Sequence, residues 1–342
     1  MKRETLCFGV VGLGEFGEVY LNCIRSLEEM LDVKTTAVCS RSGDRARELA
    51  RRFGAARWYT DVQELASDPE VDAVCVVTAE HDHFHPVMAA LAAGKDVIVE
   101  KPLSTNLSEA QTMIDTARAM GRQLLVGHLL RFATMYQHLN DQVRSGDLGR
   151  PVSIHTRRNR PASIVARYRR THPLLETGIL DIDVMLWLTR ARVERVTAVT
   201  RTIFPGPNPD LVWGILEFAG GCVGVLETSW LGPSQSGVFA DDSISVIGTQ
   251  GTARIDLSRA PLSSWNEAGF VVPDTMYSPM TGGEVGGAFR AQMMAFISAL
   301  RSGRSASLVP LDDVVRGLII ALALIRSSEE GKAVEIDEFR SN

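Results

Sequence analysis

The stretch TLCFGVVGLGEFG, residues 5–17, joins an apolar run to a glycine turn, Gly12-Leu13-Gly14-Glu15-Phe16-Gly17. The run has the length of a buried strand, and a helical pattern follows from about Glu15 to Glu28. In such a G-x-G-x-x-G turn the first glycine permits a tight bend, the second lets a pyrophosphate approach, and the third lets helix and strand pack. The helix N-terminus then faces the anion. In this context the turn predicts dinucleotide binding, and a plain glycine-rich turn is the alternative.

Short apolar runs alternate with amphipathic helical patterns up to about His128, which is typical of a parallel sheet covered on both faces. Beyond it come a helical pattern over 132–144 and then longer strand-like runs joined by Gly-Gly and Thr-Gln-Gly turns. The 342 residues suit two domains. We therefore predict an α/β fold: an N-terminal doubly wound Rossmann domain over residues 1–128, and a C-terminal α+β domain over residues 129–342. The second domain should carry a mostly antiparallel open sheet, the substrate site and the oligomer contacts.

Composition excludes several classes of protein. The formal net charge of -5 argues against nucleic acid or an anionic membrane as a partner. The longest apolar helical stretch, Leu318 to Ile325, is too short to span a bilayer, and no cleavage site follows the basic and apolar start of the chain. Five cysteines without a C-x-x-C pair suit a reducing compartment. We expect a cytoplasmic protein.

One local charge cluster stands out. The segment RRNRPASIVARYRR, from Arg157 to Arg170, contains six arginines and no acidic residue. It could meet a phosphate or carboxylate of a substrate, and a solvated or interface loop is the alternative.

The end of the second predicted strand bears on the choice of cofactor. An acidic residue there would hold the ribose 2′-hydroxyl of NAD, but this chain has Ser40 and Arg41, with Arg45 one turn later. A hydroxyl and guanidinium groups suit a 2′-phosphate. NADP is therefore favoured, and NAD stays open because an arginine can also stack on adenine.

The stretch VVTAEHDHFHPVMAALAAGKDVIVEKPLS, together with the glycine turn, resembles the glucose-fructose oxidoreductase/inositol dehydrogenase/MocA (Gfo/Idh/MocA) family. The triplet Glu100-Lys101-Pro102 is its most specific sign, and the similarity extends along nearly the whole chain. The resemblance implies that Lys101 lies beside the nicotinamide and the substrate and that His83 lies near the cofactor. With Gly12, Gly14 and Gly17, we expect the remaining cofactor contacts at Glu15, Phe16, Ser40, Arg41, Arg45, Thr78, His83, Glu100 and Lys101.

His81, His83 and His85 form H-x-H-x-H, but this period places three side chains on one face only in a strand, and the segment has the pattern of a loop entering a helix. We expect no metal site there. Lys101 is a candidate acid/base. Beside a cationic nicotinamide the neutral form of a lysine is favoured near neutral pH, so that its amine can assist proton transfer from a hydroxyl.

A second motif departs from the family. The family pattern D-x-G-x-H-x-x-D, whose histidine is the principal acid/base, corresponds here to residues 176–183, with Leu180 at the histidine position. Glu176, Leu180 and Asp183 would share one face of a regular helix. Glu176 and Asp183, with Arg131, are therefore candidates for binding substrate hydroxyls, and Asp183 as a cap or packing residue is the alternative.

Three consequences follow from Leu180. Lys101 acts alone as acid/base, His172 supplies the imidazole, or the usual reaction is lost; we favour the first and list Lys101, Asp183 and His172 as catalytic candidates. The leading prediction is an NAD(P)-dependent dehydrogenase or reductase that transfers hydride to or from a carbinol carbon of a sugar, sugar derivative or cyclitol. The alternatives are an NADP-binding sensor or partner subunit without turnover, and a non-redox enzyme with a retained cofactor. A homodimer or homotetramer is expected from the resemblance.

Overall fold

The structure is a computed structural model that describes residues 5–164, 170–234, 240–258, 262–267, 269–303 and 308–341. Its contacts divide the chain into two compact units. The first comprises Met1–Leu129 and Met276–Leu311, and the second comprises Leu130–Thr275 and Asp312–Asn342. The predicted boundary after residue 128 therefore lies beside a division that the contacts also make, but the segment Met276–Leu311 returns to the first unit, which the sequence did not indicate.

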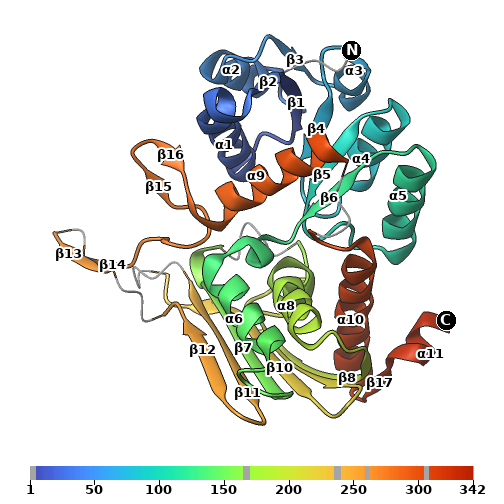
Figure 1. The fold of residues 1–342 in the computed structure, drawn as a ribbon, viewed down its shortest axis with the longest axis vertical. Coiled ribbons are helices and arrows are strands. Elements are labelled where there is room, and N and C mark those ends of the chain that lie inside the picture. Colours follow the sequence, from blue (N-terminus) through green and yellow to red (C-terminus); the bar gives the residue numbers. More distant parts are fainter. Residues whose placement is uncertain are drawn as a thin grey trace. The chain divides into compact units, whose positions relative to one another are not determined.

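The first unit contains a six-stranded parallel sheet in the order β3-β2-β1-β4-β5-β6 (Figure 1). Its order reverses beside β1, as in a doubly wound fold. Helices α1 and α2 contact each other, and α3, α4 and α5 form a second contacting group. The strands are β1 (Leu6–Val11), β2 (Val33–Cys39), β3 (Arg57–Tyr59), β4 (Ala73–Val76), β5 (Asp96–Glu100) and β6 (Leu124–Gly127). The helices are α1 (Glu15–Leu31), α2 (Gly43–Phe53), α3 (Val62–Ser67), α4 (Phe84–Ala92) and α5 (Leu107–Ala119).

The later segment joins this unit through α9 (Gly287–Ser302), which follows the short hairpin β15 (Met280–Thr281) and β16 (Glu284–Val285). Phe289 of α9 is buried and packs edge-to-face on Tyr20 of α1, with ring centroids 4.8 Å apart. Arg290 donates to Ser26 of α1 over 2.8 Å. An apolar helix face is stable where it finds a matching surface, and α1 provides that surface far away in sequence.

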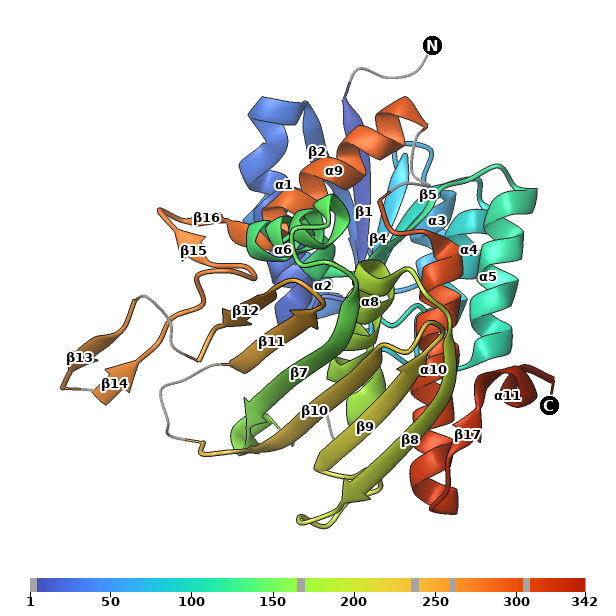
Figure 2. The same cartoon turned by 60° about the horizontal axis from the view of Figure 1, so that its bottom comes forward.

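The second unit contains a seven-stranded sheet in the order β12-β11-β7-β10-β9-β8-β17, in which β7 and β10 run parallel and all other neighbours run antiparallel (Figure 2). The strands are β7 (Pro151–Pro161), β8 (Val193–Arg201), β9 (Leu211–Phe218), β10 (Val223–Gly232), β11 (Asp241–Gly248), β12 (Thr252–Asp256) and β17 (Val334–Glu335). A separate hairpin joins β13 (Ser264–Asn266) to β14 (Gly269–Val271). The predicted fold class is confirmed.

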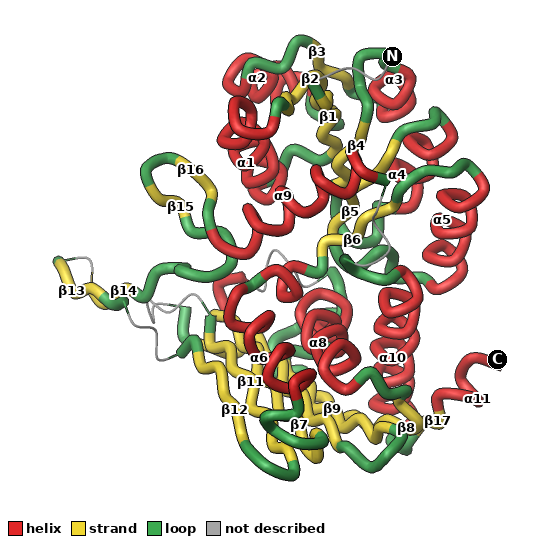
Figure 3. The backbone as a smooth tube through the Cα atoms, in the orientation of Figure 1, coloured by secondary structure: helices red, strands yellow, loops and turns green. Residues whose placement is uncertain are grey.

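Helices α6 (Thr134–Ser145), α8 (Ile179–Thr189) and α10 (Leu311–Glu330) lie on one face of this sheet (Figures 1 and 3). The other helical elements of the unit are η1 (Leu129–Phe132), η2 (Ala162–Ile164), η3 (Leu174–Gly178) and α11 (Ile336–Ser341). α8 contacts both β7 and β10, and a Cβ at Gly214 of β9 would meet Leu324 of α10 at 3.1 Å. Strand residues alternate accordingly, so that Ile154, Leu216 and Leu226 are buried beneath the helices. In the part of the chain that the structure describes, no helix combines the length and the apolar content that crossing a membrane requires.

Candidate functional site

The glycine turn lies where β1 ends and α1 begins, and each glycine has a different reason to lack a side chain. Gly12 has φ of 95°, and a Cβ there would lie 2.4 Å from the carbonyl oxygen of Val77. A Cβ on Gly17 would lie 2.2 Å from the carbonyl oxygen of Gly12, so this glycine lets α1 pack against the turn. At Gly14 a Cβ would meet nothing within 4 Å. The first and third glycines are therefore required by packing, whereas the second borders open space.

The start of α1 fits a dinucleotide pyrophosphate. Gly14 is the N-cap residue and supplies no side chain to cap the first turn. The first N–H groups of a helix lack intrahelical partners and carry the positive end of its dipole, so they bind anions. Gly14 can let a phosphate approach closely, since no side chain covers its backbone. The geometry of Gly12, Gly14 and Gly17 is thus compatible with a pyrophosphate, and their contact with it stays a prediction.

Two further residues of the turn differ in setting. Glu15 is exposed in the first turn of α1. Phe16 is 39% exposed, and its ring packs edge-to-face against Tyr20 at 5.9 Å and Phe289 at 5.5 Å. Phe16 therefore helps to hold α9 against α1, a role that the sequence did not suggest, since Phe289 lies far along the chain.

The three residues predicted to bind the ribose 2′ position differ in how far their side chains are already bound by other residues of the protein. Ser40 accepts a hydrogen bond from the Ser42 backbone N–H over 3.3 Å. Arg41 is exposed, and no ion pair within the described residues involves it. Arg45, by contrast, pairs with Glu18 and with Glu48, and its Nε donates to the carbonyl oxygen of Leu13 over 3.2 Å. The donors of Arg45 are thus engaged by other residues of the first unit, because α2 lays it across the start of α1, which does not favour the predicted contact with a cofactor.

The Glu100-Lys101-Pro102 triplet follows β5, and the Lys101–Pro102 peptide bond is cis. The Tyr20 hydroxyl donates to Glu100 Oε1 over 2.7 Å, and the Lys101 backbone N–H donates to Glu100 Oε2 over 3.3 Å. Burial and then the Glu100 charge raise the pKa of Tyr20 well above its ordinary value, so the hydroxyl stays a donor. The Glu100 carboxylate therefore ties α1 to the backbone of Lys101, whose side chain is half-buried. This geometry assigns Glu100 to positioning.

His83 lies beneath the same turn. It is 1% exposed, with Nδ1 2.8 Å from the carbonyl oxygen of Pro102 and Nε2 3.3 Å from that of Thr78. Burial lowers its pKa, so the ring is neutral, and the shorter contact indicates that Nδ1 carries the proton. The ring therefore connects the loop after β4 to the Lys101–Pro102 turn instead of presenting a nitrogen to a cofactor. His81 and His85 are exposed, so the three histidines do not share a face.

Thr78 also has internal partners. Its hydroxyl donates to the carbonyl oxygen of Asp82 over 2.9 Å, which closes the loop that leads into α4. The carboxyl ends of β1, β4 and β5 thus carry a connected set of turns, as expected at the switch point of a doubly wound sheet.

The helix that matches the family's second motif does not begin as a regular α-helix. Residues Leu174–Gly178 form the π-helical turn η3, and α8 begins at Ile179. The regular α-helical spacing assumed for Glu176 and Leu180 is therefore not present, because a π-turn contains more residues than an α-turn. Glu176 is half-buried, whereas Leu180 is 9% and Asp183 1% exposed. Thr177 reaches across to the sheet, where its hydroxyl lies 2.7 Å from that of Thr228.

Arg131 and Asp183, both predicted to bind substrate, bind each other. Arg131 Nη2 donates to Asp183 Oδ1 over 2.7 Å, and Nε donates to Oδ2 over 2.9 Å. A second carboxylate, from Asp313 of α10, accepts from Nη2 over 3.0 Å, and the guanidinium lies 5.7 Å from the ring of Trp187. Arg131 is 5% exposed. The pair therefore joins η1, α8 and α10, which supports the packing alternative for Asp183.

A second buried network was not foreseen. Arg158 of β7 is fully buried and pairs with Asp181 of α8 over 2.8 Å and with Asp242 of β11 over 2.9 Å. Arg160 also pairs with Asp242. Alternation along β7 places Arg158 on the same face as the buried Ile154, so the sequence could have indicated that Arg158 is buried. Its partner Asp242 could not be predicted, because it depends on the β7–β11 register.

Three arginines of the arginine-rich segment, all on β7, are thus paired within the protein. Arg157 pairs with Asp241 over 2.7 Å, and Arg158 and Arg160 pair as described. Arg170 is exposed, while Arg167 and Arg169 lie outside the described residues. The three arginines of β7 form ion pairs with carboxylates of this chain. Neither the predicted contact with an anionic substrate nor the alternative of a solvated loop applies to them.

His172 lies directly before Pro173, the N-cap residue of η3. Its Nδ1 accepts a hydrogen bond from the Leu174 backbone N–H over 3.2 Å, and its carbonyl oxygen accepts from Leu175 and Glu176. Burial lowers the pKa of His172 to about 4, so the ring is neutral at pH 7. Because Nδ1 accepts, Nε2 carries the proton. His172 can therefore donate a hydrogen bond from Nε2 but cannot act as a general base in this arrangement.

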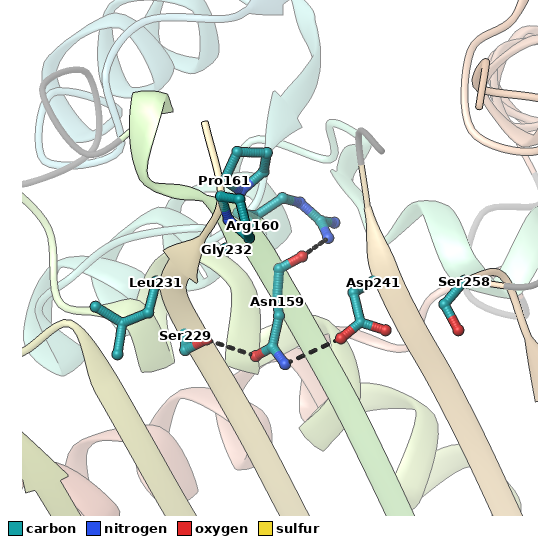
Figure 4. A pocket seen from close by; sticks show the side chains of 9 residues that line it. Asn159, Arg160, Pro161, Ser229, Leu231, Gly232, Asp241 and Ser258 are labelled. Carbon is teal, nitrogen blue, oxygen red and sulfur yellow. Dashed lines mark hydrogen bonds between the residues drawn. The ribbon is translucent and has the colours of Figure 1, made fainter. Parts of the chain in front are cut away.

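A cavity of about 430 Å³ lies at the end of β7, β10 and β11 (Figure 4). Asn159 is at its centre, donating to Asp241 over 3.3 Å and accepting from Ser229 over 2.9 Å. Arg160 donates to the Asn159 carbonyl oxygen over 3.0 Å. Its lining is Asn159, Arg160, Pro161, Ser229, Leu231, Gly232, Pro233, Asp241 and Ser258. The central polar groups satisfy one another.

Two family models match consecutive parts of the chain. The model of an oxidoreductase family with an NAD-binding Rossmann fold, Gfo/Idh/MocA, matches residues 6–128, and the C-terminal domain model of the same family matches residues 136–254. This chain belongs to the Gfo/Idh/MocA family. The family predicted from the glycine turn and the Glu100-Lys101-Pro102 triplet is thereby confirmed.

Individual Gfo/Idh/MocA relatives match along nearly the full chain. The myo-inositol 2-dehydrogenase of Thermotoga maritima is 27% identical over 96% of this chain and 98% of its own. The scyllo-inositol 2-dehydrogenase (NAD(+)) of Bacillus subtilis is 25% identical over 100% and 99%. The crystal structure of a probable dehydrogenase from Thermotoga maritima, 26% identical, superposes with a TM-score of 0.82 over 97% and 100%. The chain is thus an oxidoreductase of this family, with an NAD-binding fold in its first unit.

Proposed function

We propose that this chain transfers a hydride reversibly between C4 of a nicotinamide and a carbinol carbon of a cyclitol or sugar. The observation that carries the proposal is the conjunction of the open space at Gly14 with Lys101 held at the end of β5. The names of the two inositol dehydrogenases support a polyol as substrate. The nicotinamide cofactor supplies or accepts the hydride when bound.

Lys101 is the proposed acid/base. The position of the family's histidine is Leu180, which cannot move a proton, and His172 is held as a neutral donor. Lys101 exchanges the proton of the substrate hydroxyl as hydride leaves the carbon. Glu176 and the Nε2–H of His172 are proposed to bind substrate oxygens, whereas Arg131 and Asp183 hold their helices in place.

For the cofactor, the family description supports NAD. NADP remains the preferred prediction, and in this structure it rests on Ser40 and Arg41, because Arg45 is engaged elsewhere. An exposed guanidinium can pair with a 2′-phosphate that NAD lacks.

The test follows nicotinamide absorbance with NAD or NADP and a panel of cyclitols, sugars and sugar lactones. We expect one polyol to reduce the cofactor, and Lys101→Ala to lower turnover by about 10²–10⁴-fold. Lys34→Ala, an exposed lysine of β2, is the matched control and should turn over normally.

Leu180 favours a second candidate function. A protein that binds cofactor tightly but is reduced by no polyol would be a sensor, or a non-redox enzyme that retains its nicotinamide. Conversion of a polyol or glycoside without net change in absorbance would identify the enzyme among these two.

We further propose a homodimer or homotetramer formed through the open face of the second sheet. Large apolar side chains protrude from neighbouring strands there, with Val199 52%, Trp213 44% and Ile215 44% exposed. Val199 pairs with Trp213 across β8 and β9, so they form one patch, and such a patch marks an interaction surface. Light scattering should show Trp213→Glu as a smaller species, whereas Trp58→Glu, on β3, should leave the mass unchanged. A wild-type monomer would contradict the proposal.

A further inference from the structure

A single guanidinium reaches the glycine turn from a neighbouring helix. Arg45 Nε donates to the carbonyl oxygen of Leu13 over 3.2 Å, and Leu13 lies between Gly12 and Gly14. The peptide that joins Leu13 to Gly14 is planar and trans, so its carbonyl oxygen and its N–H point in opposite directions. A bond that holds the oxygen on the side of α2 therefore directs the Gly14 N–H to the other side.

The Gly14 N–H is itself available. Within the described residues it donates no hydrogen bond to the protein, and a Cβ at Gly14 would meet nothing within 4 Å. A backbone donor beside open space at a helix start is suited to a phosphate oxygen. Arg45 thus acts on a group that both NAD and NADP would contact, since the pyrophosphate is common to them.

Glu18 keeps Arg45 in this place. Its Oε1 pairs with Arg45 and its Oε2 accepts from Arg52 over 2.6 Å, so one carboxylate of α1 holds two arginines of α2. Glu48 pairs with the remaining Nη1 of Arg45 over 3.1 Å. With two carboxylates beside it, the Arg45 charge is compensated, and its donors point at the protein.

We propose that Arg45 is a positioning residue that orients the Leu13–Gly14 peptide for the pyrophosphate, and that Arg41 alone among these arginines distinguishes the ribose 2′ position. The inference rests on the proposed nicotinamide-dependent function. It changes the role of Arg45 from a ligand of one cofactor to a support for both.

Calorimetric titration of the full chain with NAD and with NADP tests it. Arg45→Lys keeps a positive charge beside Glu18 but loses the hydrogen bond to Leu13. It should lower the affinity for NAD and for NADP by the same factor, about tenfold. Arg41→Ala should weaken NADP alone. Arg47→Ala, on the same helix but stacked 5.0 Å from Trp58, is the control and should change neither. A loss confined to NADP in Arg45→Lys, or no loss, would overturn the proposal.

Glu18→Gln is the second variant, with thermal melting of each protein checked beside the titrations. Loosening Arg45 should weaken both cofactors several-fold, by roughly the contribution of one charge-assisted hydrogen bond. Tighter NADP binding would instead show that a released Arg45 reaches the 2′-phosphate, and would contradict the inference. A wild type that binds neither cofactor overturns this inference together with the proposed function, whereas binding without turnover of any substrate overturns the proposed dehydrogenase alone.

Discussion

The glycine turn of the first unit and helix α8 of the second use their polar groups in opposite ways. Among the residues that the structure describes, the Gly14 N–H of the turn has no protein partner, and it borders open space. α8 instead carries Asp181 and Asp183, each 1% exposed and each paired with an arginine. A ligand site needs donors that the protein has not already used, so the turn has the properties of a binding site and α8 those of a support.

The difference has a physical cause. α8 is buried on nearly every side, so any carboxylate on it must be paired or lose its charge. The turn lies at the end of a sheet, where backbone groups can be satisfied by a ligand or by water. Substitutions at Arg158, His172 and the two glycines Gly14 and Gly17 test this difference.

The largest effect is expected from Arg158→Ala. It leaves the carboxylates of Asp181 and Asp242 buried without Arg158, and removal of one partner from a buried pair costs about 3–5 kcal/mol of unfolding free energy. Urea denaturation measures it. Arg195→Ala, which removes an exposed pair with Glu217, is the control and should change little. Equal losses of unfolding free energy in the two variants would show that the buried network contributes no more to stability than an exposed ion pair.

The next effect concerns His172 and pH. Its folded pKa of about 4 lies below the ordinary value, so the unfolded chain takes up the proton first as the pH falls. The stability from keeping His172 neutral is fully present above about pH 6.5 and is lost progressively toward pH 4. Between pH 7 and pH 5 the wild type should lose about 2 kcal/mol more than His172→Asn, whose amide oxygen can still cap η3.

Denaturation curves at several pH values give this difference directly. His83, whose pKa burial also lowers, is present in both proteins and cancels in the comparison. Parallel pH dependences would mean that burial does not lower the pKa of His172.

The smallest effects are expected from alanine substitutions at two glycines of the turn, Gly14 and Gly17, which should differ in kind. Gly14→Ala places a methyl group in open space, so folding should change little while both cofactors bind about tenfold or more weakly. Gly17→Ala places its Cβ against the Gly12 carbonyl oxygen and should lower the unfolding free energy by about 1–3 kcal/mol. Unchanged cofactor affinity in Gly14→Ala would remove the turn from the binding site.

Much of the fold was predictable because it depends on local patterns. The alternation of apolar runs and helices predicted the parallel sheet, and the hairpin turns predicted the antiparallel one. The return of α9 to the first unit was not predictable, since its partner Tyr20 lies far away in sequence. The π-turn before α8 was missed because its residues carry no local signal that separates a π-turn from an α-turn.

The candidate site shows the same division. The glycine turn could be predicted from the sequence, because its spacing is local and Gly17 meets the carbonyl oxygen of Gly12 only five residues earlier; the close contact of Gly12 with Val77 depends on the pairing of β1 with β4. The tertiary structure alone decided which charges remain available: Arg45 meets Glu18, Arg131 meets Asp183 and Arg158 meets Asp242 through helix packing and strand register. The sequence indicates that a buried charged residue needs a partner of opposite charge. Which residue becomes that partner depends on which distant segments the fold brings within about 3–4 Å.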